Sequence, residues 1–355
     1  MILILIIVLG GSSITLIADR AKTAPVYGVH DIILQQEAAM RYLLQGRNPY
    51  RETYFGTPVE SFHYDELGQP AVNPALFHFV MPPWYLLFPF IFYFISLPIL
   101  GFFDGRMALL SCLVGLLAVI YRWLKNKDLA RLAIIMTALS PATVNYFLEG
   151  RSDLFALFWL MWSLYLLEKK QLIWSGIILG LACMSKQTIW FILPFYGFYL
   201  WVKAKRSITE LFKALVPVGL VVGLLALPFL IWNFKAFADS VVFYLSGKAA
   251  NSYPVSGYGW GMVLYQWGII KDLHSYYPFV VWQAMISIPI LILLIMRLHR
   301  KPLMSGLLIS YSLFLLVFWY FSRYFNNSHI AYISSIFMLG VVKLVDEQTL
   351  STEGQ

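Results

Sequence analysis

The sequence is poor in charged residues and nearly free of cysteine. Only 12% of its 355 residues are charged and 60% are hydrophobic, whereas about 25% of the residues in a typical soluble domain are charged. The apolar residues form long runs rather than the one-sided stripes of surface helices. This composition excludes an ordinary cytosolic enzyme, a disordered chain and a nucleic-acid-binding module, and it predicts a polytopic membrane protein.

Familiar cofactor and catalytic motifs are also missing. The two cysteines, Cys112 and Cys183, lie inside apolar runs, which excludes a disulfide framework and a thiolate metal site. There is no Walker loop, GxGxxG, HExxH or G-x-S-x-G motif, and the sequence requires no cofactor. His63, Asp65 and Glu66 could ligate a divalent metal, but we favour a solvated loop for this segment.

What the chain has instead is a series of apolar runs. A spanning helix needs about 20 predominantly apolar residues, and about ten runs approach that length. They cover residues 1–18, 105–124, 130–147, 154–168, 171–185, 187–202, 213–232, 279–296, 303–321 and 329–345. A further run, 84–100, contains Pro89 and Pro98. Because proline bends or breaks helices, we predict that this run is a re-entrant or interfacial element on the outer side.

Basic residues are concentrated in alternate short connections between these runs. One set of connections, with the C-terminal segment, holds Arg122, Lys125, Lys127, Arg131, Lys169, Lys170, Lys203, Lys205, Arg206, Lys213, Arg297, Arg300, Lys301 and Lys343, whereas the other set holds Arg151, Lys186 and Arg323. Because basic residues mark the cytoplasmic side, we expect both termini in the cytoplasm. The outer loops are then 19–104 and 233–278, in an all-α membrane domain over 1–345 with a cytoplasmic tail at 346–355.

Ionisable residues beside membrane spans are costly, which makes each one a candidate for function. The segment VHDIILQQEAAM holds Asp31 and Glu37, and LEGRSD holds Glu149, Arg151 and Asp153. The alternatives are that Asp31 or Asp153 only caps the helix that follows it, or that LEGRSD forms a surface salt bridge. The predicted topology places both segments on the outer side.

Isolated cations lie on the same predicted side. Lys186, in MSKQTIW, is the only charge between residues 171 and 202, and Arg323 lies in SRYFNNSH with His329. Cations near the interface suit a phosphate ester presented from the bilayer, although Lys186 could also be a snorkelling anchor. The aromatic segment SYPVSGYGWG contains Gly257, which would allow the backbone close to a ligand, but an interfacial aromatic belt is an equal alternative.

Taken in order, these features resemble the integral-membrane GT-C glycosyltransferases. An apolar first span is followed by D-x5-E, by LQGRNPY and by a PPW-type segment, and then by NYFLEGRSDLF, KQTIWFILP and SRYFNNSHIAYI. The likeness covers roughly residues 1–345 and is strongest to bacterial members that use polyprenyl-phosphate sugars. It implies a polytopic all-α fold with interfacial helices on the outer face.

The resemblance also implies roles for individual residues. Asp31 corresponds to the catalytic base of the first outer loop, and Lys186 and Arg323 would hold the carrier phosphate. The remaining predicted substrate-binding residues are Glu37, Glu149, Arg151, Asp153, Gln187 and Tyr324. His30 stands where the family often has a second acidic residue, which weakens a metal-dependent mechanism.

We therefore expect a glycosyltransferase of a bacterial inner membrane. It would transfer a hexose such as mannose from a polyprenyl-phosphate donor to a glycan or lipid acceptor on the outer face, with the bilayer as its other partner and no nucleic acid. The alternative is a non-catalytic transporter or flippase of lipid-linked saccharides. Transporters carry inverted repeats and midplane charges, and this sequence shows neither.

Overall fold

The computed structural model describes residues 2–140 and 144–353, and it is dominated by helices. In chain order these are α1 (Ile2–Leu5), α2 (Gly11–Lys22), α3 (Asp31–Leu44), α4 (Pro83–Leu87), α5 (Phe90–Leu100), α6 (Arg106–Trp123), α7 (Lys127–Ala138), α8 (Val144–Glu149), α9 (Asp153–Glu168), α10 (Leu172–Cys183), α11 (Leu193–Lys203), α12 (Ile208–Ala238), α13 (Tyr244–Ser246), α14 (Trp260–Gln266), α15 (Phe279–Arg300), α16 (Met304–Tyr320) and α17 (Asn327–Glu353). Two π-helical turns, η1 (Ile6–Gly10) and η5 (Asp239–Phe243), and three 3-10 turns, η2 (Pro58–Ser61), η3 (Pro74–Leu76) and η4 (Gln187–Ile192), complete the helical elements.

Strands contribute little to the fold. β1 (Asp65–Glu66) pairs with β2 (Gln69–Pro70) in an antiparallel hairpin, and β3 (Ser256–Gly257) pairs in parallel with β4 (Tyr324–Phe325). A side chain at Gly257 would collide with the backbone of Phe325. The glycine therefore permits a close approach to β4, where the sequence suggested an approach to a ligand.

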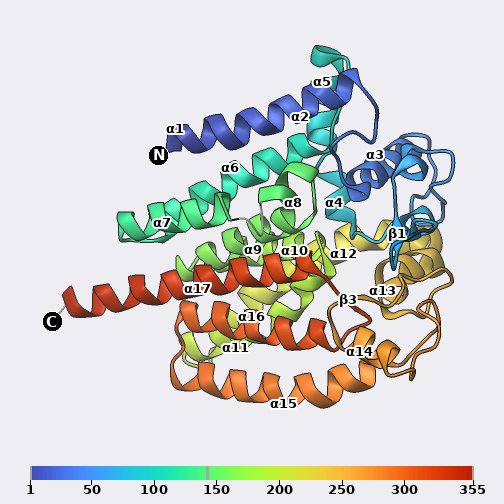
Figure 1. The fold of residues 1–355 in the computed structure, drawn as a ribbon. Coiled ribbons are helices and arrows are strands. Elements are labelled where there is room, and N and C mark those ends of the chain that lie inside the picture. Colours follow the sequence, from blue (N-terminus) through green and yellow to red (C-terminus); the bar gives the residue numbers. More distant parts are fainter. Residues whose placement is uncertain (1, 141–143, 354–355) are drawn as a thin grey trace.

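The long helices pack side by side into one bundle (Figure 1). α9 lies between α6 and α10, α10 packs on α12, and α16 packs on both α15 and α17. Gly176 and Gly180 of α10 face α12, where a β-carbon at Gly176 would collide with the carbonyl oxygen of Ala214. Small residues spaced four apart let two membrane helices approach closely, which explains this tight pair.

The predicted spans match the helices unevenly. Among the described residues, five helical stretches are long and apolar enough to cross a membrane: Pro83–Leu100, Arg106–Trp123, Ile208–Ser246, Phe279–Arg300 and Asn327–Thr349. The helices Leu172–Cys183 and Met304–Tyr320 are apolar but shorter. The expected span 130–147 is divided between α7 and α8, with 141–143 outside the described residues. The count of about ten spans stays a prediction.

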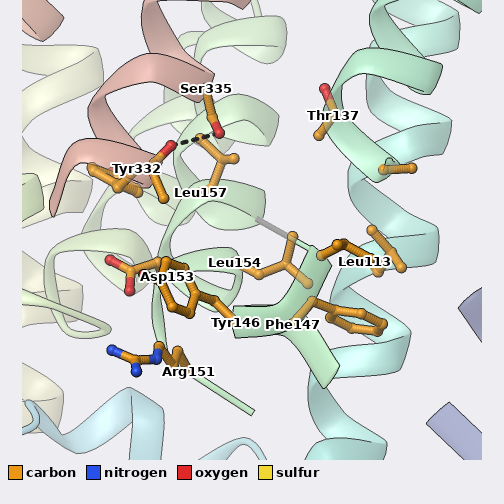
Figure 2. Close-up of a pocket in the computed structure, with 13 residues that line it drawn as sticks. Leu113, Thr137, Tyr146, Phe147, Arg151, Asp153, Leu154, Leu157, Tyr332 and Ser335 are labelled. Carbon is orange, nitrogen blue, oxygen red and sulfur yellow. Dashed lines mark hydrogen bonds between the residues drawn. The ribbon is translucent and has the colours of Figure 1, made fainter. Parts of the chain in front are cut away.

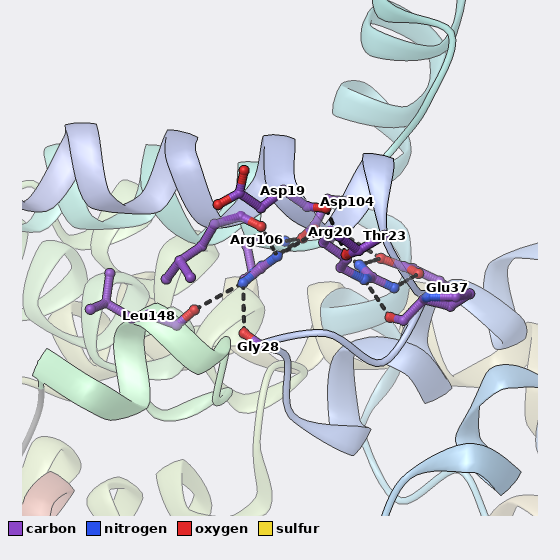
Figure 3. A network of polar contacts seen from close by, with 11 residues as sticks. Asp19, Arg20, Thr23, Gly28, Glu37, Asp104, Arg106 and Leu148 are labelled. Carbon is purple, nitrogen blue, oxygen red and sulfur yellow. Dashed lines mark hydrogen bonds and ion pairs between the residues drawn. The ribbon is translucent and has the colours of Figure 1, made fainter.

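The proline-containing run 84–100 forms the separate helices α4 and α5, with Pro89 between them. Its length and composition would allow it to span. However, α5 runs across the axes of α2 and α6 rather than along them (Figures 1 and 3). Whether this run spans or is interfacial, as the sequence predicts, stays a prediction.

One end of the bundle carries most of the irregular structure (Figure 1). The segment 23–82, with α3 and the β1–β2 hairpin, gathers there with α13, α14 and the β3–β4 pair. The free ends of α1 and α17 point away from this end (Figure 1). Residues from both predicted outer loops therefore share one end of the molecule.

The C-terminal boundary differs from the sequence prediction. α17 continues to Glu353 instead of ending near residue 345, so that the described part of the predicted tail is helical. Asp346 is fully buried and accepts hydrogen bonds from the backbone amides of Lys125 and Asn126. This carboxylate therefore fixes the turn before α7, and the cytoplasmic location of 346–355 stays a prediction.

Candidate active site

A polar cavity of about 330 Å³ lies at the irregular end of the bundle. It is lined by His30, Asp31, Ile32, Gln35, Phe62, Tyr64, Asn73, Ala75, His78, Val80, Met81, Arg151, Ser152, Asp153, Lys186, Gln187, Tyr244, Leu245, Tyr253, Tyr324, Asn326, Ser328 and His329. Among the residues predicted from the sequence, Asp31, Arg151, Asp153, Lys186, Gln187 and Tyr324 line this cavity. The structure thus brings together side chains from four segments that are far apart in the chain.

Asp31 is the first residue of α3 but not its cap. The N-cap residue is His30, whose backbone is extended and whose ring Nδ1 lies 3.3 Å from the amide nitrogen of Ile32. The carboxylate of Asp31 instead lies 2.7 Å from His30 Nδ1 and accepts a 3.0 Å hydrogen bond from Asn73 Nδ2. The alternative that Asp31 merely caps a helix is therefore wrong.

The surroundings of Asp31 keep it ionised. Burial acts to raise the pKa of the Asp31 carboxyl. The charge and hydrogen bond of His30 and the hydrogen bond from Asn73 lower it by more, so the net pKa lies below the usual value. His30 Nδ1 cannot donate to Asp31 and accept from Ile32 at once, because one ring nitrogen carries either a proton or a lone pair. The shorter distance, 2.7 Å against 3.3 Å, favours donation to Asp31.

A second charged pair lies in the same cavity. Asp153, the first residue of α9, accepts a 2.6 Å hydrogen bond from Lys186 Nζ, and both side chains are less than one-fifth exposed. Lys186 lies between α10 and η4, so its partner comes from a different part of the chain. An ammonium has three donors, and this pair leaves two of them for a ligand.

The loops that carry the two carboxylates are joined through their backbones. The amide of His30 donates a 2.7 Å hydrogen bond to the carbonyl of Glu149. Gly150, with a φ of +92°, follows, and a β-carbon there would lie 2.6 Å from Ile33 of α3. This left-handed turn requires glycine, and it holds the start of α9 against the start of α3.

Two members of the LEGRSD segment have different positions. Arg151 lines the polar cavity and stacks on Tyr146 at 4.2 Å, whereas Glu149 is not among the lining residues. The side chain of Glu149 is 44% exposed and lies 3.3 Å from Arg151 Nε. Arg151 and Asp153 also border a small, mainly apolar pocket between α6, α9 and α17 (Figure 2). The segment thus contributes a cation and one carboxylate to the cavity.

Glu37, predicted to bind substrate, lies outside the polar cavity in a buried ion network (Figure 3). Both of its carboxylate oxygens lie 2.8 Å from the guanidinium of Arg20, which also contacts Asp104. Asp104 in turn accepts two hydrogen bonds from the side chain of Arg106. The geometry gives Glu37 a structural contact, and its predicted contact with substrate stays a prediction.

Arg323 is held by backbone groups outside the polar cavity. Its guanidinium donates to the backbone carbonyls of Tyr253, Leu273 and Ser275, and the side chain is almost fully buried. It does not line the polar cavity. Three of the five N–H donors of Arg323 bind carbonyl groups of the second outer loop, so this side chain fixes that loop, and its contact with a carrier phosphate stays a prediction.

The sequence analysis missed several lining residues. Asn73 both caps η3 through its side-chain oxygen and donates to Asp31, and His78 contacts Ser240 and the carbonyl of Ala250. An asparagine before a proline is a turn signal, so the position of Asn73 in AVNPAL could have marked it. His78 and Tyr253 carry no comparable local signal.

The three residues that could have ligated a metal do not converge. His63 lies 3.0 Å from Asp65, whereas Glu66 lies 2.9 Å from His274 in the second outer loop. Within the described residues, no group of three histidine, cysteine or acidic side chains could hold a metal ion. The contacts of Glu66 therefore join two outer loops.

Fold and site together define a membrane protein with a polar, charge-lined cavity at one end of an apolar helical bundle. Residues 79–322 match the family model described as Glycosyltransferase family 87. This match covers more than half of the chain, and the protein belongs to glycosyltransferase family 87, a family of the GT-C superfamily of membrane glycosyltransferases. No curated protein and no solved structure matches the chain. The resemblance seen in the sequence is confirmed.

Proposed function

We propose that this glycosyltransferase transfers a hexose such as mannose from a polyprenyl-phosphate donor to a glycan or lipid acceptor, with Asp31 as the general base. The observation that carries the proposal is that Asp31 and Lys186 line one cavity. An ionised carboxylate can accept a hydroxyl proton, and an ammonium can stabilise a phosphate. The alternative, a non-catalytic transporter, is disfavoured by membership in a glycosyltransferase family.

The reaction is a single displacement. The acceptor hydroxyl oxygen forms a bond to the anomeric carbon while the bond from that carbon to the phosphate oxygen breaks. The hydroxyl proton passes to Asp31, and the electron pair of the broken bond stays on the polyprenyl phosphate. Because attack and departure occur on opposite sides of the carbon, the configuration of the anomeric centre inverts.

The cations of the cavity suit the departing phosphate. Lys186 retains free donors beside Asp153, and Arg151 lines the same cavity. Charge that develops on the phosphate oxygen during bond breaking is stabilised by such fixed cations. Asp153 balances the charge of Lys186 when no phosphate is bound.

The proposal includes an outer-face active site in a bacterial inner membrane, with both termini in the cytoplasm. It is supported by the concentration of basic residues in alternate connections. It is also supported by the position of the polar cavity at the end of the bundle opposite the free ends of α1 and α17 (Figure 1).

A transfer assay with two donor classes tests this function. Purified protein in proteoliposomes receives a labelled hexose either as a polyprenyl-phosphate ester or as a nucleotide ester, together with lipid and glycan acceptors. We expect label on an acceptor from the polyprenyl-phosphate donor alone. Transfer from the nucleotide donor would contradict the proposal. Failure of both donor classes to transfer either mannose or glucose would also contradict it.

A further inference from the structure

A second cavity, of about 350 Å³, adjoins the polar cavity. It lies between η4, the η5–α13 segment, α15 and α16, and Gln187 and Leu245 line both cavities. Aromatic rings dominate its wall: Trp190, Phe191, Phe243, Phe279, Phe318 and Trp319. We call it the aromatic cavity.

Four uncharged polar side chains of the aromatic cavity have protein partners already. Gln187 Nε2 donates to the carbonyls of Val80 and Val241, and Gln283 Nε2 donates to that of Phe318. The hydroxyls of Ser246 and Ser322 likewise donate to backbone carbonyls. A saccharide needs many hydrogen-bond partners, and this wall offers it few. An apolar ligand suits the wall better.

One cation on this wall is unpaired. Lys248 is exposed and, within the part of the chain that the structure describes, its ammonium has no hydrogen bond or ion pair. Arg323, the other cation of the wall, is bound to carbonyl groups. Gly247, the residue before Lys248 in the chain, packs on the Arg323 guanidinium. The buried indole nitrogen of Trp319 also lacks a hydrogen-bond partner among the described residues. Unpaired donors beside an apolar wall suit an anion with a hydrocarbon tail.

The rim of the aromatic cavity carries exposed apolar side chains. Val242, Tyr276 and Val280 line the cavity and are 44%, 50% and 58% exposed. On α12 and α15, exposed apolar side chains such as Ile231 and Met285 extend the same kind of surface. The rim thus presents apolar side chains to which a chain in the bilayer could bind.

We propose that the aromatic cavity holds the hydrocarbon chain of the lipid-phosphate donor next to its phosphate, and that Lys248 contacts this phosphate. This inference rests on the proposed function, and it assigns to Lys248 the contact that the sequence assigned to Arg323. The shared residue Gln187 would then lie where the phosphate meets the sugar. The pocket beside Arg151, at about 40 Å³, has room for roughly one water molecule and not for a chain.

Binding of a sugar-free polyprenyl monophosphate to the purified full-length protein tests the inference independently of sugar transfer. Two variants address it, each with a matched control. Lys248→Ala removes the unpaired cation, and Lys271→Ala removes another exposed cation of the same outer loop. Val280→Trp fills the cavity, and Val281→Trp places the same bulk on the next residue of α15, which is 57% exposed and does not line the cavity.

We expect Lys248→Ala to weaken binding about tenfold, the scale of one charge-assisted hydrogen bond at an exposed site. Val280→Trp should weaken binding of a long-chain phosphate and leave that of a short-chain analogue unchanged, and both controls should bind as wild type does. Equal binding by all five proteins, or none by wild type, would overturn the inference. If Val280→Trp raises only the acceptor KM, the cavity holds the acceptor and the inference is wrong. If polyprenyl phosphate binds as expected but the protein transfers no sugar, the proposed function is contradicted and the inference about the aromatic cavity stands.

Discussion

Two groups of charged residues lie at the same end of this molecule, and they differ in how completely their members are paired. In the buried network, Arg20, Glu37 and Asp104 have side chains that are 8% exposed or less, and each carboxylate has two or more charged or backbone partners. In the polar cavity, Asp31 and Lys186 are 16% and 17% exposed and retain free hydrogen-bonding capacity. The first group stabilises the fold, whereas the second can bind and react.

Asp31 and Glu37 make this comparison sharp because they belong to one helix. Six residues of α-helix correspond to a rotation of about 240°, so the two carboxylates face different surroundings. Asp31 faces the polar cavity at the start of α3, and Glu37 faces Arg20 at the end of α2. Substitutions in the two groups should therefore separate activity from stability.

The largest effect is expected for Asp31→Asn. Asparagine keeps the size of the side chain but cannot take the acceptor proton, so turnover should fall roughly 10²–10⁴-fold, the usual worth of a positioned acid–base group. Thermal stability should change little. The measurement is labelled-hexose transfer by purified protein, with Asp65→Asn, an exposed acid on the same outer loop, as the control. A fully active Asp31→Asn would remove Asp31 from the mechanism.

Glu37→Gln should give the opposite pattern. It leaves the buried guanidinium of Arg20 short of a charged partner, and breaking a buried pair costs about 3 kcal/mol of folding free energy. Turnover per folded molecule should stay close to that of the wild type, because Glu37 does not line the cavity. Thermal unfolding in detergent measures the loss of stability, and the same transfer assay measures the turnover. A stable but inactive Glu37→Gln would restore the substrate contact predicted from the sequence.

Lys186→Gln tests the cation of the polar cavity. The loss of a charge-assisted hydrogen bond to phosphate should raise the donor KM about 10- to 100-fold, and the acceptor KM should not change. The control is Arg323→Lys, which we expect to lower stability because lysine cannot reach three carbonyl groups at once. An unchanged donor KM in Lys186→Gln would leave Lys186 as a partner of Asp153 only.

The smallest effect concerns His30, which holds the pKa of Asp31 below its usual range against the opposing effect of burial. A base acts in its ionised form, so kcat/KM should fall only when the pH drops below this lowered pKa. His30→Asn keeps a good helix cap but removes the imidazole, so that the pKa of Asp31 rises. The acid limb of the pH profile should then move to higher pH. His63→Asn, at an exposed position, is the control, and an unmoved limb would mean that His30 does not act on the base.

The sequence by itself determined the membrane class, the family and most of the segments that form the polar cavity. Long apolar runs can bury their backbone only as helices in a bilayer, and the charges that interrupt them are few enough to be noticed one by one. Asp31, Asp153 and Lys186 were found in this way, and each lies in the cavity.

Only the tertiary structure decided which charges are free. Arg323 looks like Lys186 in sequence, an isolated cation at a helix boundary, yet three of its five N–H donors bind carbonyl groups some 50–70 residues away. Glu37 resembles Asp31 in the sequence, and only the fold shows that Glu37 pairs with Arg20. Lys248 becomes a candidate for phosphate binding only because the fold places it on the wall of the aromatic cavity. A hydrogen bond depends on distances of a few ångströms, and such distances between remote segments arise only from packing of the whole chain.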